Sequence, residues 1–233
     1  MSKLRSAIFA SILAVQALFA ANVANAAVVT GSSGGSFSDI SGCHGNDNCR
    51  INNTSNGSNT QLEWGYSFLN SGSTLTAVDR MWSVNTDAND VIIAELAWTN
   101  KSTSSSVTPD AFSALYTLAI KFTSPNGAND TEPFNLSIFN TANNPADTLN
   151  GLALADLMNL SFGLNGVIIS DLKYTLDGSG ASFKNNIWTN DENHTSRMYI
   201  TADFKHAVPE PASLIILATG LLGVGLSRRL SKK

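Results

Sequence analysis

The sequence predicts an all-β protein whose central part folds as an antiparallel β-sandwich of about eight to ten strands in a jelly-roll-like arrangement. Apolar and polar side chains alternate with a period of two in several stretches, as in strands with one buried and one solvated face. Gly, Asn, Ser and Pro cluster between these stretches and predict turns. Thr, Val, Ile and aromatic residues, which favour strands, are frequent within them.

The expected strands follow one another along the chain. Residues 28–60 are rich in Gly, Ser and Asn, with Phe37 and Ile40 as larger apolar side chains before the first cysteine. Clear alternation begins at residue 61. The apolar side chains that we expect on buried faces are Leu62, Trp64, Tyr66 and Phe68; Ala94, Leu96 and Trp98; Tyr116, Leu118, Ile120 and Phe122; Phe134, Leu136 and Ile138; and Met198, Ile200, Ala202 and Phe204. A further strand is expected at 167–175, whereas the leucine spacing in 149–160 fits a short helix as well as a strand.

The first 26 residues are typical of a secretory signal peptide. Lys3 and Arg5 precede a short apolar stretch, and Ala24-Asn25-Ala26 provides the small residues of a cleavage site. Cleavage after Ala26 would make Ala27 the first residue of the mature chain. The alternative, an N-terminal anchor that is retained, is disfavoured because the apolar stretch is short for a membrane span.

Residues 208–233 have three parts. Val208-Pro209-Glu210-Pro211 is held extended by its prolines, and residues 212–226 lack charge and predict a transmembrane helix. Fifteen residues span only about 22 Å at 1.5 Å per residue, against a hydrocarbon core of about 30 Å, so the span is marginal. Four basic residues follow and predict that the tail stays cytoplasmic: Arg228, Arg229, Lys232 and Lys233.

This three-part layout resembles the PEP-CTERM sorting signal, which implies recognition by the membrane enzyme exosortase in a Gram-negative bacterium. The resemblance implies export across the inner membrane by the general secretion machinery and transient anchoring there by the C-terminal helix. Delivery to the cell surface or the extracellular matrix would follow. The alternative, a buried core helix at 212–226, is disfavoured by the basic cluster directly behind it.

Removal of both signals leaves one secreted domain at 27–207. Residues 27–208 carry 8 Lys and Arg against 17 Asp and Glu, a net charge of −9. A surface of this charge repels phosphate backbones, so no nucleic-acid partner is expected. It is compatible with cation binding or simply with solubility outside the cell.

The domain itself resembles the choice-of-anchor type K domains. The resemblance covers about residues 31–205 and rests on short motifs in a common order: Gly35-Ser36-Phe37-Ser38, Gln61-Leu62-Glu63-Trp64-Gly65, Ala94-Glu95-Leu96-Ala97-Trp98-Thr99-Asn100 and Asn140-Thr141. It departs at Ala94-Glu95, where that family tends to have a Gly. The resemblance implies a surface or matrix domain and supplies no catalytic residues to carry over.

Cys43 and Cys49 predict a disulfide, because an exported chain enters an oxidising compartment. Five residues lie between them, so we expect the bridge to fix a local turn rather than to hold the fold together. The alternative, a metal site that adds His44, lacks a recognisable fourth ligand, and no metal is expected there.

No enzyme is expected from the motifs. The histidines His44, His194 and His206 form no His-x-x-x-His pair, and no phosphate-binding glycine loop is present. Glu63 and Glu95 could face each other across a sheet as in glycosidases, although isolated acids on strand faces are more often simply solvated.

Two loops and one tryptophan are candidate binding elements. The loops Asn85-Thr86-Asp87-Ala88-Asn89-Asp90 and Asn190-Asp191-Glu192-Asn193 offer oxygen ligands that suit Ca²⁺, with ordinary Asx turns as the alternative. Trp188 lies among polar residues, which predicts an exposed loop position and a possible sugar contact. We therefore expect a non-enzymatic structural or adhesion protein of the surface or matrix, with an exopolysaccharide-binding carbohydrate module as the alternative.

Overall fold

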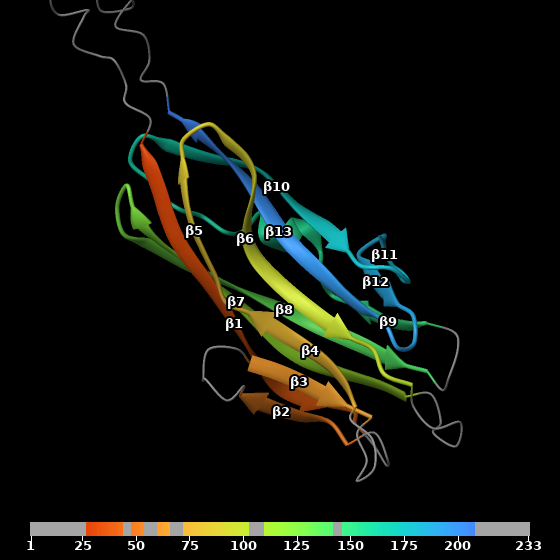
Figure 1. Cartoon of the computed structure of the whole chain (residues 1–233). Coiled ribbons are helices and arrows are strands. Elements are labelled where there is room, and N and C mark those ends of the chain that lie inside the picture. Colours follow the sequence, from red (N-terminus) through yellow and green to blue (C-terminus); the bar gives the residue numbers. More distant parts are fainter. Residues whose placement is uncertain are drawn as a thin grey trace, which may run out of the picture.

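A computed structural model describes residues 27–43, 48–53, 60–65, 72–102, 110–141 and 146–207 (Figure 1). The described part contains thirteen strands and one short helix. Their bounds are β1 (Val28–Ser41), β2 (Arg50–Asn53), β3 (Thr60–Trp64), β4 (Ser73–Val78), β5 (Arg80–Asn85), β6 (Ala88–Thr99), β7 (Asp110–Ser124), β8 (Ala128–Asn140), β9 (Asp147–Asn150), α2 (Leu154–Leu157), β10 (Val167–Asp177), β11 (Ala181–Lys184), β12 (Ile187–Asn190) and β13 (Thr195–His206).

The strands form two antiparallel sheets that pack on one common core, which confirms the predicted antiparallel β-sandwich (Figure 1). One sheet has seven strands in the order β11-β12-β9-β8-β7-β1-β5, and the other has six in the order β10-β13-β6-β4-β3-β2. The strand number exceeds the expected eight to ten. The surplus comes from strands of only four residues, such as β2, β9, β11 and β12, which are too short for alternation to reveal them.

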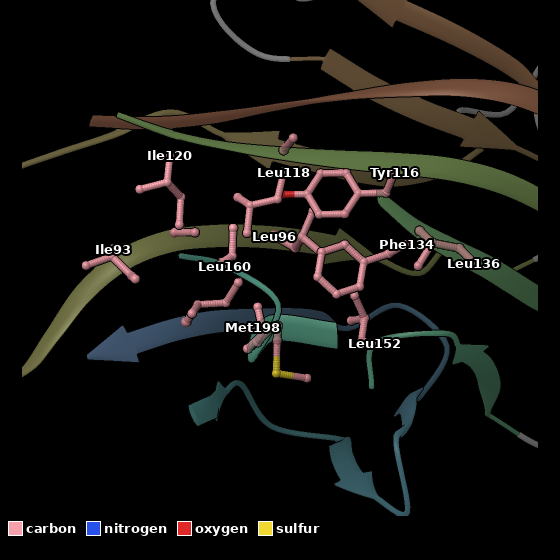
Figure 2. Packing of buried hydrophobic residues seen from close by; sticks show 14 of the residues in the cluster. Ile93, Leu96, Tyr116, Leu118, Ile120, Phe134, Leu136, Leu152, Leu160 and Met198 are labelled. Carbon is pink, nitrogen blue, oxygen red and sulfur yellow. The ribbon is translucent and has the colours of Figure 1, made fainter. Parts of the chain in front are cut away.

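The long strands carry the predicted alternation. On β7, each inward-facing side chain from Phe112 to Phe122 is buried, and β8 and β13 contribute their alternate residues to the same core. Figure 2 shows side chains from both sheets interdigitating, with Tyr116 stacked beside Phe134 at a ring separation of 5.9 Å. The strand expected at 167–175 is also confirmed as β10. Tyr66 and Phe68 lie outside the described residues.

Three tryptophans connect the two sheets through direct ring contacts. The Trp98 ring lies 6.2 Å from Trp64, and its edge meets Trp188 at 5.2 Å between ring centroids. All three side chains are fully buried, and Trp188 Nε1 donates a hydrogen bond to Ser196 Oγ at 3.1 Å. The sheets therefore meet over an aromatic contact that excludes water at this end of the sandwich.

The prediction that Trp188 is exposed is wrong. Residues 187–190 form β12, which pairs with β9 on one side and β11 on the other. Alternation within this strand directs Trp188 and Asn190 inward. The polar neighbours that suggested a loop belong instead to the β11–β12 turn, where Asn185 and Asn186 adopt positive φ. A buried indole offers no face to a sugar.

The ambiguous segment at 149–160 contains both a strand and a helix. Leu149 belongs to β9 and points into the core, and the single-turn helix α2 ends at Leu157, which is buried. Gly151 separates them with φ +107°, and a Cβ atom there would lie 2.1 Å from the carbonyl oxygen of Asn135. A glycine is therefore required where the chain leaves the sheet.

Glycines in β1 explain how a strand with few apolar residues lies in the middle of a sheet. Gly31 is the direct partner of Trp82 on β5, and a Cβ at Gly31 would lie 2.3 Å from Trp82 Cζ2. Gly35 makes room in the same way for Tyr116, with 2.5 Å to Cε2. The neighbouring strands thus cover β1 with aromatic rings that only glycine can accommodate.

The predicted disulfide is confirmed. Cys43 and Cys49 are bonded, with their Cα atoms 6.0 Å apart, within the usual range. The bridge joins the chain just after β1 to the chain just before β2, and therefore lies where the backbone leaves the seven-stranded sheet for the six-stranded one.

Gly31 provides a direct test of the packing on β1. Gly31→Ala should destabilise the protein by about 1–3 kcal/mol, because the added methyl group overlaps Trp82. Gly127→Ala is the matched control, since a Cβ at Gly127 meets nothing within 4 Å. Urea unfolding of both variants measures the difference, and equal midpoints would contradict the packing described.

Candidate functional site

Glu63 and Glu95, the two acids considered as a catalytic pair, are held by separate arginines. Glu95 is 2% exposed and pairs with both Arg80 and Arg197. The Arg80 guanidinium also lies 5.7 Å from the centre of the Tyr199 ring. Among the described residues these side chains form one ion-pair network over the outer face of the six-stranded sheet, which explains why Glu95 is buried on a face that should be wet.

Glu63 has its own partners on the neighbouring strand β2. Its Oε2 accepts hydrogen bonds from Arg50 Nε at 2.7 Å and from Asn52 Nδ2 at 2.6 Å. Strand β4 separates Glu63 on β3 from Glu95 on β6. The structure therefore gives each carboxylate a structural ion pair and does not bring the two together.

The first loop considered for calcium leads into an acidic cluster. The carboxylates of Asp90, Asp171 and Asp203 approach one another within 4.8 Å, at positions where β6, β10 and β13 lose their regular register. Lys173 Nζ lies 2.6 Å from Asp90 Oδ1 and 2.7 Å from Asp171 Oδ2. Hydrogen bonding to Lys173 lowers the pKa of Asp171, and the two carboxylates raise the pKa of Lys173. The lysine ammonium thus supplies the positive charge that this cluster requires.

The second loop borders a group of polar side chains inside one end of the sandwich, which we call the buried polar end. Its members are Asn100, Asn140, Asp147 and Asn190, all with 0% exposure. Asn100 Nδ2 donates to the Asn190 carbonyl at 2.8 Å, and Asp147 Oδ1 accepts from the Thr141 backbone at 2.7 Å. Asn190 and Asp147 are direct cross-strand partners between β12 and β9.

The sequence analysis named Asn190 in a candidate calcium loop and Asn100 and Asn140 in motifs of the family resemblance, but it did not predict that they form one buried group, and it did not single out Asp147. A usable signal exists, because three strands end with an inward apolar residue followed two positions later by Asn. These pairs are Trp98 and Asn100, Ile138 and Asn140, and Trp188 and Asn190. Alternation places each Asn on the buried face at the strand end. Asp147 follows no such pattern and could only be found from the fold.

Glu192 lies in the β12–β13 turn beside the buried polar end. Burial, and to a lesser extent the negative charge of Asp147, raise the pKa of its carboxyl to about 7, and a hydrogen bond from the Ser102 hydroxyl partly offsets both effects. Among the described residues, neither carboxylate oxygen receives a hydrogen bond of ordinary geometry. Two acids therefore share a poorly hydrated corner of the domain.

Two hollows differ greatly in size. Between the sheets, a cavity of about 10 Å³ lined by Tyr116, Tyr174 and Met198, among others, holds at most about one water molecule. On the outer face of the seven-stranded sheet, an open hollow of about 850 Å³ lies over β1, β5, β7 and β8. Small residues such as Gly34 and Ala119 form its floor, and polar side chains form its rim: Asp79, Arg80, Lys121, Asn129, Asp130 and Thr131.

The sorting elements lie largely outside the described residues. These are the signal peptide, the segment 208–211, the predicted helix at 212–226 and the basic cluster. Ala27 is described, and its carbonyl accepts a hydrogen bond from Thr86 N at 2.8 Å. Within the described ranges, no helix is both long and apolar enough to span a bilayer.

The raised pKa of Glu192 predicts that the stability of the folded protein depends on pH. In the folded protein Glu192 keeps its proton up to about pH 7, whereas the unfolded chain loses it near pH 4.5. The contribution of Glu192 to stability is therefore complete below pH 4.5 and is lost as the pH rises through 7. Between about pH 5 and about pH 8 the wild type should lose about 1–2 kcal/mol more than Glu192→Gln.

Urea unfolding at both pH values measures this difference. Asp191→Asn, which changes an exposed acid in the same turn, should behave as the wild type. Parallel stability profiles for the wild type and Glu192→Gln would show that Glu192 is not desolvated as the structure indicates.

Comparison with known proteins identifies one feature, at the C-terminus. Residues 207–229 match the family model of the PEP-CTERM protein-sorting motif, directly after β13 ends at His206. No curated protein shows significant similarity to the chain. The match covers residues 208–229 of the tail predicted at 208–233. It implies an exported, cell-surface-targeted PEP-CTERM protein that an exosortase processes and sorts.

Proposed function

We propose that residues 27–207 form a non-enzymatic structural or adhesive domain of the cell surface or the exopolysaccharide matrix. The observation that carries this proposal is the PEP-CTERM motif, which begins at residue 207, one position after the last strand. The folded domain therefore passes into the sorting motif without an intervening segment. At the other end the sheet begins at Val28, so cleavage after Ala26 would leave every strand intact.

The described structure supports a binding or structural role over catalysis. Glu63 and Glu95 are paired with arginines, and Lys173 forms ion pairs with Asp90 and Asp171, two of the three acids in the cluster with Asp203. Within the described part of the chain, the cavity between the sheets that Tyr116, Tyr174 and Met198 help to line has room for about one water molecule and none for a substrate. The net charge of −9 for residues 27–208 favours solubility outside the cell.

The proposed processing follows from the tail. Residues 212–226 serve as a transient membrane anchor, since their span of about 22 Å is short of the hydrocarbon core. The extended segment Val208-Pro209-Glu210-Pro211 lies just outside the bilayer and is accessible to a membrane-bound protease such as exosortase. Cleavage near this segment would release the domain from the inner membrane.

Fractionation of the producing cells tests this proposal. A chain that ends at Ala207 and the full-length chain should distribute differently among medium, surface and membrane, and the surface form should lack the residues beyond about 208–211 by intact mass. Replacement of Pro209 and Pro211 by Ala should impair processing, whereas Pro133→Ala, an exposed proline on β8, should not. Identical distributions, or surface protein that still carries Lys233, would contradict sorting with release.

A carbohydrate-binding module is the second candidate function. The observation that favours it is the open hollow, which replaces Trp188 as the candidate sugar site. Its floor of small residues admits a chain of sugars close to the backbone, while its rim offers amide, hydroxyl and charged groups that suit sugar hydroxyls. The hollow measures about 850 Å³, which is enough for a few sugar units.

Ala119 gives a clean test of this second candidate. Ala119→Leu fills the floor of the hollow from an exposed position and should reduce retention on the organism's exopolysaccharide several-fold. Ala111→Leu, on the same face of β7 but outside the hollow, should retain wild-type binding. Absence of binding by the wild type, or equal binding by both variants, would count against the hollow as a sugar site.

A further inference from the structure

The start of β1 and the end of β13 lie at the same end of the sandwich (Figure 1). The β5–β6 turn links them through its backbone. Thr86 N donates a hydrogen bond to the Ala27 carbonyl at 2.8 Å, and Asp87 N donates to the Phe204 carbonyl. The β7–β8 turn and residues 163–166, which lead into β10, complete this end of the domain. We call it the exit end, because the chain leaves the fold here toward the sorting motif.

Hydrogen bonds at the exit end fix the chain up to Ala207. Ala207 N donates to the Gly166 carbonyl at 2.9 Å. The Asn126 side chain, in the β7–β8 turn, holds the segment before Gly166, since its Nδ2 donates to the Gly163 carbonyl at 2.8 Å and its Oδ1 accepts from Asn165 N at 2.7 Å. These bonds join a turn of the seven-stranded sheet to the two outermost strands of the six-stranded one. The exit point is therefore a rigid part of the fold.

The sorting motif begins on this rigid part. The family match starts at residue 207, so Ala207 belongs to both the motif and the fold. Only residues 208–211 separate it from the helix predicted at 212–226, and four residues span at most about 14 Å. Lipid headgroups occupy about 5–7 Å of that distance. A single helix is about 10–12 Å across, so a protease that cuts at 208–211 has to touch the exit end.

Two glycines leave the exit end open to close approach. Gly127 and Gly163 are both exposed, and a Cβ atom at either position would meet nothing within 4 Å. Neither has a positive φ, so the fold itself does not require glycine there. Glycine at such a position costs stability through the entropy of the unfolded chain. What it provides is a surface without side chains, beside the Asn126 contacts that hold the exit point.

We propose that the exit end is the surface on which the exosortase rests while it cleaves the chain, an inference that rests on the processing near 208–211 proposed above. The exposed groups around the two glycines are polar, with Asp87 and Asn165 among them. A polar surface of this kind suits a contact that forms for cleavage and is then released. The enzyme therefore recognises the motif together with the folded end of its substrate.

Gly163→Trp tests this contact in the producing cells. The indole would stand where the enzyme approaches, so the fraction of protein that lacks the tail, measured by intact mass, should fall several-fold. Ile187→Trp is the matched control, because Ile187 is 37% exposed on β12, which leads to the turn at the opposite end of β13. This variant should be processed as the wild type is. Both variants should keep the urea midpoint of the wild type, since each adds its bulk at an exposed position.

A spacer separates a blocked contact from a damaged fold. Six Gly and Ser residues inserted between Ala207 and Val208 have a root-mean-square length of about 13 Å and move the cleaved segment away from the exit end. The spacer should restore processing of Gly163→Trp to near the level of the wild type. A photoreactive residue in place of the exposed Asn165 should capture the exosortase, whereas one in place of Asp191, at the opposite end, should not.

Four results would overturn the proposal. Full processing of Gly163→Trp, or a loss that the spacer does not restore, would show that the exit end is no contact surface while leaving the proposed processing intact. Capture of lipid alone from position 165 would place the exit end on the bilayer instead of the enzyme. A wild-type chain that keeps its tail at the cell surface would overturn the proposed processing and this inference together.

Discussion

Contact between tryptophans of opposite sheets is the interaction on which the rest of the structure depends. Trp64 and Trp98 belong to the six-stranded sheet and Trp188 to the seven-stranded one, and Trp98 touches both of the others. Each buried tryptophan removes about 150–250 Å² from water, which amounts to about 4–6 kcal/mol per residue as an upper bound. A second ring cluster, in which Phe122 contacts Trp82 and Phe204, also joins three strands from both sheets, but it contains only one tryptophan.

The same contact determines where the polar groups lie. Because Trp98 and Trp188 point inward, the residues two positions later also point inward, and both are asparagines. Asn100 and Asn190 then satisfy backbone groups of the opposite sheet through their amide nitrogens. The buried polar end is thus a consequence of the two-residue period of the strands. Its hydrogen bonds hold the β12–β13 turn and strand β9 against the core.

Much of the fold could be predicted from the sequence, since β6, β7, β8 and β13 are long enough for alternation to be unmistakable. Short strands escaped because four residues contain only two inward positions. Trp188 is the clearest example of a wrong prediction that resulted. Its polar neighbours indicated a loop, whereas pairing of β12 with β9 and β11 makes it part of the core. Pairing between distant segments is a tertiary property that local pattern does not carry.

Some residues of the candidate sites could likewise be predicted from the sequence, and others could not. Asn190 and Glu192 were found from their loop, and the disulfide from its spacing and the export signals. Asp147 and the partnership of Asp90 with Asp171 and Asp203 depend on strand register, which brings residues more than 40 positions apart into contact. The open hollow depends likewise on small residues of β1 and β7 lying side by side.

Tryptophan fluorescence of the exported protein tests the central contact most directly. All four tryptophans are buried, and Trp82, the most exposed, shows 7%. The structure therefore predicts strongly blue-shifted emission and little quenching by acrylamide, both lost together on unfolding. A red-shifted component that acrylamide quenches in the native protein, and that disappears in Trp188→Phe, would contradict the account, because Trp188 would then lie in water rather than between the sheets.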